Sequence, residues 1–391
     1  MTIKVSKPAI NIREELADLK QDTGLKGQEL MRADTAQEVR TAIGAGRKNL
    51  IINGGMNVAQ RATSATTLVH STYHTVDRWT QNFTGPAAFT SEQSTDAPVG
   101  FNSSYKIACT TAEASLAATS RLMPYYRVED KGLGYLKFGT SSAEDLTMSF
   151  WVKSNKTGTY QINLWHLNVS GYISATYSIN SSATWEKKII TFKGDIGTAM
   201  GDDKDMALQL EFILTGGSNY KGGTFIPNTT GTYPGYAANT RAVKQTVNLA
   251  DSTSNYWQIT GVQLEVGSVA TEFEHRSYGE ELALCMRYYY AMSAAQGAYY
   301  SSYLTRWITE YSTYPVEMRA NPTVSYKSGS IRYAYYQYNY MSDNLSALST
   351  KYGDEKGVSL IIVATGSYSP TNHGMFTAVS NSYRVNIDAE L

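Results

Sequence analysis

The sequence predicts a mainly β protein, with short N-terminal helices, a central antiparallel β-sandwich and a tyrosine-rich β C-terminal domain. Tyrosine outnumbers phenylalanine by 30 to 10, and glycine reaches 31, a composition typical of β-rich chains whose aromatic rings must tolerate water. From about residue 50, apolar and polar residues alternate in short runs, and clusters of Gly, Asn, Ser and Pro separate the runs. Helical spacing is confined to a few short segments.

Residues 1–48 are predicted to form an attachment segment of short helices. One amphipathic helix follows Pro8, and a second, over 35–43, starts with a capping box and ends at a Gly pair. Neither is long enough to be stable alone, so we expect both to pack on a partner chain or a larger assembly; a disordered arm is the alternative. The predicted contact residues are Ile12, Leu16, Leu19, Val39 and Ile43.

Residues 49–275 are predicted to form the sandwich. In LTMSFWVK, residues 146–153, Leu146, Met148, Phe150 and Val152 share one face and polar residues share the other, as in a half-buried strand. Similar runs follow at residues 159–165, 172–178, 185–192, 206–214 and 256–266. Many short strands with almost no helix between them favour two packed antiparallel sheets.

Residues 276–391 are predicted to form a separate distal domain. Helical spacing over 278–291 predicts a short connecting helix, and β-like segments follow it. Seventeen of the 30 tyrosines come after residue 285. If IRYAYYQYNY, residues 331–340, is one strand, Tyr336, Tyr338 and Tyr340 share one face and Tyr335 lies on the other.

Charge and cysteine content exclude several classes of function. The formal net charge is +0 and charged residues make up 17%, so nucleic acid is not an expected partner. The first residues lack the apolar region of a signal peptide, and no apolar run is long enough to enter a membrane. Cys109 and Cys285 lie far apart and have no metal-ligand spacing around them, which argues against a disulfide framework or a structural zinc site.

Several motifs together resemble tail-fibre and related appendage proteins of tailed bacteriophages. They are NLIINGGMNVAQRATS, YHTVDRW, FWVKS, the stretch WQITGVQLEV to CMRYYY at residues 257–290, and YPVEMRANPTV at residues 314–324. The resemblance implies that the middle region is a jelly-roll module akin to carbohydrate-binding modules, followed by a variable tip. It also implies a virion location and a homotrimer whose N-terminus contacts other virion proteins. The chain lacks the repeat shaft of a long fibre, so a compact appendage fits better.

No constellation of residues predicts catalysis. No nucleophile elbow, triad or metal cluster stands out, and two carboxylates spaced across a sugar cannot be recognised from sequence. Asp202, Asp203 and Asp205 crowd one loop and are a weak candidate for a structural Ca²⁺ site, because calcium prefers oxygen ligands. A solvated acidic turn is the favoured interpretation. We therefore expect no enzyme activity and no cofactor beyond this possible calcium.

Aromatic residues remain as candidates for binding. A sugar presents an apolar C–H face and a polar rim, which suits aromatic rings beside hydrogen-bonding groups. Trp79, Trp151, Trp185 and Trp257 are expected to pack in the core or between strands rather than to bind a ligand. The predicted glycan-binding residues are Tyr335, Tyr336, Tyr338 and Tyr340, with subunit contact as an equal alternative for the same side chains.

The sequence thus predicts a phage tail-fibre protein that is assembled in the host cytoplasm and attaches the virion to a host-surface glycan. A capsid or tail decoration protein without receptor binding is the first alternative, and a polysaccharide depolymerase is a less favoured one. The host, the receptor and the copy number leave no mark in the sequence.

Overall fold

The computed structural model describes residues 48–293, 298–301, 306–309, 312–328, 331–335, 338–343, 345–364 and 384–390. The predicted N-terminal helices, with Ile12, Leu16, Leu19, Val39 and Ile43, lie outside the described residues. The chain divides into two compact units, Met1–Asn49 and Leu50–Leu391, of which the second is described below. The domain boundaries expected at residues 48 and 275 stay predictions.

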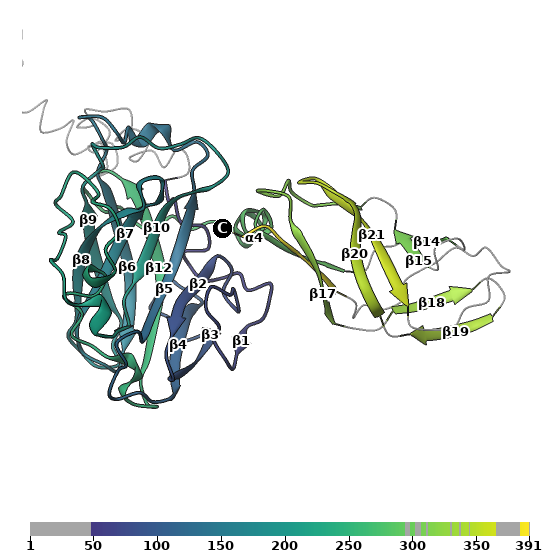
Figure 1. Cartoon of the computed structure of the whole chain (residues 1–391), viewed down its shortest axis with the longest axis horizontal. Coiled ribbons are helices and arrows are strands. Elements are labelled where there is room, and N and C mark those ends of the chain that lie inside the picture. The colour runs from purple at the N-terminus through teal and green to yellow at the C-terminus, as the bar shows by residue number, and fades with distance from the viewer. Residues whose placement is uncertain are drawn as a thin grey trace, which may run out of the picture. The chain divides into compact units, whose positions relative to one another are not determined.

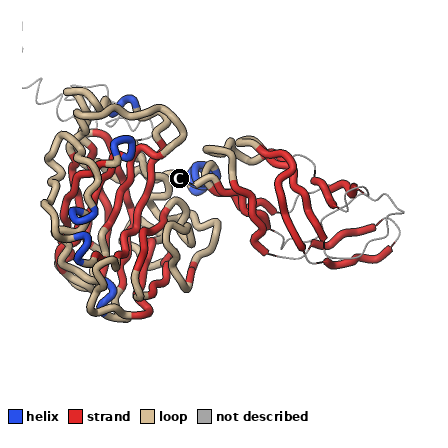
Figure 2. The backbone as a smooth tube through the Cα atoms, in the orientation of Figure 1, coloured by secondary structure: helices blue, strands red, loops and turns tan. Residues whose placement is uncertain are grey.

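Two six-stranded antiparallel sheets form the sandwich, as the sequence predicted (Figures 1 and 2). Sheet A has the order β1-β3-β4-β12-β6-β9, and sheet B has the order β11-β5-β10-β7-β8 with β2 beside β5. The strands of sheet A are Ser64–Ala65, Ala88–Ser94, Ser104–Thr111, Tyr256–Val266, Leu146–Ser154 and Glu186–Phe192. Those of sheet B are Thr215–Gly216, Arg121–Glu129, Met206–Phe212, Gly158–His166, Gly171–Ile179 and Trp79–Thr84.

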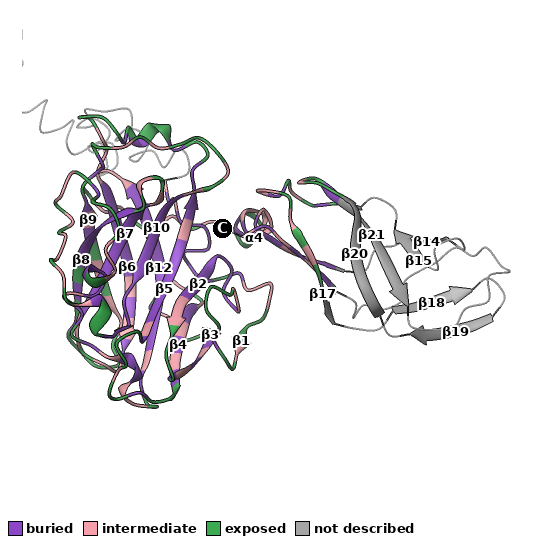
Figure 3. Ribbon diagram, in the orientation of Figure 1, coloured by how far each residue is buried: buried purple, intermediate pink, exposed green. Residues whose placement is uncertain are grey.

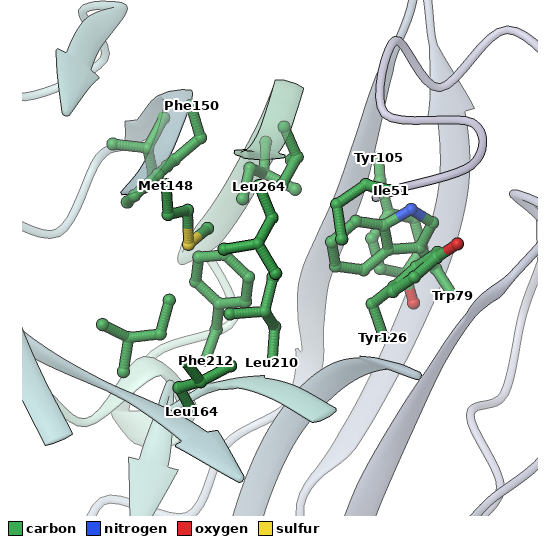
Figure 4. Packing of buried hydrophobic residues seen from close by; sticks show 14 of the residues in the cluster. Ile51, Trp79, Tyr105, Tyr126, Met148, Phe150, Leu164, Leu210, Phe212 and Leu264 are labelled. Atoms are coloured by element: carbon green, nitrogen blue, oxygen red, sulfur yellow. The ribbon is translucent and has the colours of Figure 1, made fainter. Parts of the chain in front are cut away.

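The core lies between the two sheets, and both contribute alternate residues to it. Phe212 of β10 packs in this core beside Phe150 of β6 (Figure 4), and its ring centroid lies 5.4 Å from that of Phe150 and 5.4 Å from that of Trp257 of β12. Trp79 and Trp257 are buried in this core, as expected, whereas Trp151 and Trp185 are half-exposed. The buried colour runs along the strands of both sheets in Figure 3. The apolar face predicted for residues 146–153 is therefore the face that packs in the core.

Bulges or other irregularities interrupt three strand pairs of the sandwich, and one of them lies in β12, between β4 and β6 of sheet A. Gly261 has φ +60 at the register shift of β12, and the ring of Phe101 occupies the space that its side chain would fill. A glycine is required there because any Cβ would meet that ring. The described 3₁₀ turns are Gly134–Leu136, Leu167–Val169, Ser218–Tyr220, Ala238–Thr240 and Leu249–Asp251.

The helix predicted after the sandwich is present but shorter than expected. Helix α4 spans Tyr278–Met286 and begins with a capping box in which Ser277 and Glu280 bond each other's backbone N–H groups. It ends before Tyr289, which starts strand β13 instead of continuing the helical face. In the described part of the chain, every helix is too short or too polar to cross a membrane.

The described residues after α4 form three further antiparallel sheets. The base sheet has the order β13-β22-β17, and its strands span Tyr289–Ser293, Arg384–Asp388 and Thr323–Ser328. A five-stranded sheet contains Ala298–Ser301, Arg306–Thr309, Gly357–Ala364, Ser312–Thr313 and Leu345–Gly353, which are β14, β15, β21, β16 and β20. The last sheet has two strands, β18 at Ile331–Tyr335 and β19 at Tyr338–Asp343.

The single strand expected over residues 331–340 is wrong. The segment forms a hairpin in which Tyr335 of β18 lies opposite Tyr338 of β19. Face alternation along one continuous strand therefore cannot assign its tyrosines to two surfaces, because the chain reverses between them. Period-two patterning alone gives no signal for such a reversal when its turn lacks Gly, Pro or Asp.

Candidate functional site

A row of planar side chains crosses the outer face of sheet B. The strand register places Gln209 of β10 opposite both Arg127 of β5 and Trp165 of β7, and it places Trp165 opposite Tyr172 of β8. Directly opposed residues of antiparallel strands share a face of the sheet. Arg127, Gln209, Trp165 and Tyr172 therefore form one line, here called the cross-strand row.

Aromatic rings stack at one end of this row. The ring centroids of Trp165 and Tyr172 lie 4.3 Å apart. On Trp165 stacks Tyr236, at 5.7 Å and an interplanar angle of 28°. Tyr236 is 51% exposed, whereas Trp165 is only 7% exposed. The indole thus supports the phenol, and the phenol is the ring that faces solvent.

Polar groups continue the row away from the aromatic rings. Arg127 Nε donates a hydrogen bond to Gln209 Oε1 at 2.8 Å, and its guanidinium lies 4.7 Å from the ring centroid of Tyr125. Arg127 is half-exposed and Gln209 lies just beneath the surface. The row therefore carries a guanidinium, a carboxamide and stacked aromatic rings on four neighbouring strands, β5, β10, β7 and β8.

A buried ion pair lies in the next row of the same face. Glu211 of β10 is fully buried and forms a salt bridge with Arg241. Its Oε2 atom also accepts hydrogen bonds from Asn163 at 3.0 Å and from the Trp165 indole at 3.3 Å. Each carboxylate oxygen thus has a partner, which is the condition for burying a charge without a large penalty. The network fixes the indole on which Tyr236 stacks.

The covering segment, residues 217–247, holds Tyr236 over sheet B. Gln161 of β7 donates a 2.9 Å hydrogen bond to the Arg241 carbonyl and accepts one from the Lys244 N–H. Close to Tyr236, Gly235 bridges to Gly171 of β8, whose missing side chain lets the Tyr233 carbonyl approach. A small apolar cluster anchors the segment further along the face and contains Met123, Ile213, Tyr220 and Ala242.

The pKa values of Arg241 and Tyr172 are both raised above their ordinary values. Burial lowers the pKa of the Arg241 guanidinium, but the adjacent Glu211 carboxylate outweighs this effect, and the net shift is upward. Burial raises the pKa of Tyr172 to about 12. Tyr172 therefore stays protonated and donates to the Ala237 carbonyl at 3.0 Å. An ion pair and a neutral phenol support the exposed ring.

The four tyrosines predicted from the sequence come from the part of the chain that follows the sandwich. Tyr335, Tyr338 and Tyr340 lie in the β18–β19 hairpin, where the structure describes their strands but not their side chains. Tyr336 lies outside the described residues. Their predicted role in glycan binding or subunit contact is therefore still a prediction.

The acidic loop does not gather its carboxylates into a cluster. Asp202 accepts hydrogen bonds from the Gly132 N–H at 3.1 Å and from Lys131, and both lower the pKa of its carboxyl. Asp203 instead accepts the N–H of Asp205. Across the described residues, no group of three or more His, Cys, Asp or Glu side chains is arranged to hold a metal ion. The structure thus gives the weak calcium hypothesis no support.

Sequence reasoning missed the cross-strand row, although one signal for it was present. In TYQINLW, residues 159–165, alternation places Gln161, Asn163 and Trp165 on the face opposite the apolar core residues. These two amides and the indole are buried although they lie on the outer face of the sheet. Their partners Gln209 and Tyr236 are 44 and 71 residues beyond Trp165, so only the strand pairing could bring them together.

Comparisons with protein-family models and with curated proteins find no match for the chain. Among solved structures, a tailspike protein of bacteriophage CBA120 is similar at 10% identity and TM-score 0.30, over 56% of this chain and 21% of the tailspike chain. A family 11 carbohydrate-binding module from Clostridium thermocellum, in complex with a mixed-linked tetrasaccharide, is similar at 13% identity and TM-score 0.25 over 55% and 99%. A family 61 module bound to β-1,4-galactotriose is similar at 9% identity and TM-score 0.29 over 56% and 99%. TM-scores this low assign neither a family nor a ligand.

Proposed function

We propose that the protein is a non-catalytic attachment protein that binds a glycan on the outer face of sheet B. The observation that carries this proposal is the water-facing ring of Tyr236, stacked on Trp165 at one end of the cross-strand row. A sugar ring can pack its C–H face on such a phenol while its hydroxyl groups meet neighbouring polar groups. Gln209 and Arg127 supply those groups on the adjacent strands.

The supporting network favours affinity over chemistry. Hydrolysis of a glycosidic bond requires two carboxyl groups that face the sugar. Two acidic side chains follow members of the row on the same face: Glu211, which pairs with Arg241, and Glu129, which accepts from Arg287 at 2.6 Å and from Tyr288 at 2.9 Å. Both carboxylates are held by arginines and neither is placed as a proton donor. These pairings support binding without turnover.

Attachment of a virion is the biological role we propose for this binding. The motifs that resemble phage tail-fibre and appendage proteins support it, as does the predicted attachment segment at residues 1–48. The affinity of one site built on one exposed ring should be weak, so several copies on one particle would supply the useful strength. We expect the ligand to be a host-surface glycan.

Glycan binding by point variants tests the proposal. The purified full-length protein is screened against host envelope polysaccharide and defined oligosaccharides, and the affinity of the best ligand is measured by calorimetry. Tyr236→Ala should weaken binding about 3- to 10-fold, the loss expected when one aromatic stacking contact of about 0.5–1.5 kcal/mol is removed. Tyr256→Ala on β12 of sheet A is the matched control and should leave affinity unchanged. Equal effects of the two variants, or no glycan binding at all, would contradict the proposal.

A further inference from the structure

Four of the sequence motifs that lie far apart in the chain meet at one buried cluster. Arg61 and Arg78 come from the segments before β1 and β2, Tyr288 follows α4, and Tyr289 is the first residue of β13. Arg319 comes from the segment before β17. All of them contact the chain at Asp388–Glu390, directly after or at the end of strand β22, and the glycan site uses none of these contacts.

The two arginines bind two acidic side chains. Arg78 is 1% exposed and forms a salt bridge with Glu390, while its guanidinium lies 3.5 Å from the ring centroid of Tyr288. Arg61 bonds Asp388 at 3.0 Å and Glu390 at 3.2 Å, and its guanidinium lies 3.7 Å from the ring centroid of Tyr289. We call Arg61, Arg78, Asp388 and Glu390 the arginine joint.

Backbone contacts hold the same short segment from the other side. Arg319 Nε donates to the Ala389 carbonyl at 2.9 Å, and the Ala389 N–H donates to the Tyr288 carbonyl at 2.8 Å. The register of β22 between β13 and β17 places Asp388 opposite both Tyr289 and Thr323. The segment therefore binds as an extended acidic strand, recognised by guanidinium groups and by main-chain hydrogen bonds.

The buried ion pairs of the arginine joint stabilise the fold only when both partners of each pair are present. Glu390 is 5% exposed at its side chain, and removal of either partner of a buried ion pair leaves an uncompensated charge. The joint also links elements of the sandwich to the base sheet, because Arg78 lies between sheet B and Tyr288. Its Nη2 atom donates to the Arg127 carbonyl of β5 at 2.8 Å.

We propose that the arginine joint is a lock, in which Arg61 and Arg78 recognise the acidic segment Asp388–Glu390 and so keep the base sheet seated on the sandwich. The lock opens when these ion pairs break. The amide groups of β13, β17 and β22 then lose their protection from hydrogen exchange, while the sandwich core stays folded. The surface pair Lys204–Glu355 also joins the sandwich to the following region, but both side chains are partly exposed, and it contributes little.

Native-state hydrogen exchange of the full chain tests the lock. Glu390→Gln keeps the shape of the side chain and removes its charge, and Glu355→Gln is the matched control at the surface pair. We expect Glu390→Gln to raise amide exchange in β13 and β22 at least tenfold and to leave β6 and β7 of the core unchanged. Glu355→Gln should change neither region.

Two outcomes overturn the proposal. If amide exchange rises equally in β22 and in β6, the joint stabilises the whole fold and not the base sheet alone. If exchange in β22 is unchanged, the joint does not hold the base sheet in place. If Glu390→Gln does not fold, Asp388→Asn decides by the same criterion, because the Asp388 side chain is 40% exposed and its neutralisation is milder. Its expected effect is a smaller rise in exchange that is still confined to the base sheet.

Discussion

At the scale of single residues, the buried carboxyl of Asp77 gives a dependence of stability on pH. Burial raises its pKa to about 6, although Arg61 and the hydrogen bonds from Gln60 favour the charged form. The folded-state pKa therefore exceeds the unfolded value, and the stabilisation is present below the unfolded pKa and is lost as pH rises through about 6.

The stability of the wild-type protein relative to Asp77→Asn should therefore fall by about 2 kcal/mol between pH 4 and pH 8. Urea unfolding of both proteins at the two pH values measures it. The comparison with the variant removes the effect of the other titrating groups. If the stability of the wild type relative to Asp77→Asn stays constant or grows as pH rises, burial does not control the pKa of the Asp77 carboxyl.

The buried pair Glu211–Arg241 gives a second prediction at this scale. Arg241→Met should destabilise the protein by about 3–5 kcal/mol, because it leaves the Glu211 carboxylate buried and without its counter-ion. The double variant with Glu211→Met should recover much of that loss. Lys137→Met at the exposed pair with Glu144 should cost less than about 1 kcal/mol. Chemical unfolding of the four proteins decides whether the pair acts as a unit.

At the scale of elements, the close approach of the covering segment to β8 can be tested at one glycine. An added Cβ at Gly171 would stand 2.5 Å from the Tyr233 carbonyl oxygen, so Gly171→Ala must displace the segment that carries Tyr236. We expect a loss of about 1–3 kcal/mol in stability and weaker glycan binding together. Gly222→Ala, in the same segment, meets no atom within 4 Å and should change neither. Thermal unfolding and calorimetry on both variants check the pair of effects.

Local patterning predicted six strands of the sandwich, but it missed β1 to β5 and β11 and did not predict how the strands pair. Runs such as residues 146–153 alternate because one face is buried, and the same rule found β6, β7, β8, β9, β10 and β12. It failed over residues 331–340, where two strands of a hairpin have no turn signal between them. The site was missed for a different reason: Gln209 and Trp165 become neighbours only through the β10–β7 register, which a single sequence does not specify.

At the scale of the whole molecule, the oligomeric state expected from the sequence is a homotrimer. The helices predicted for residues 1–48 are too short to be stable alone, and we expect their apolar stripes to need a partner. Light scattering on the full-length protein should give three times the 43.1 kDa mass of the chain. A stable monomer at micromolar concentration would contradict the trimer, and it would then leave attachment to rest on single-site affinity.

Lack of turnover is the second expectation for the whole molecule. Incubation of the protein with host envelope polysaccharide should release no reducing ends, because both carboxylates near the cross-strand row are held by arginines. Release of reducing ends would make the protein a depolymerase. In that case, substitution of Glu129 and Glu211 would show whether the activity comes from this face.

The central claim is that sheet B, and not another surface, carries the glycan. A hydrogen-exchange footprint of the full-length protein with and without its best glycan ligand tests it most directly. We expect added protection in β5, β10 and residues 233–241, around Arg127, Gln209 and Tyr236, with sheet A unchanged. Protection confined to the region beyond residue 297 would contradict the claim and would return the binding role to the tyrosines of the β18–β19 hairpin.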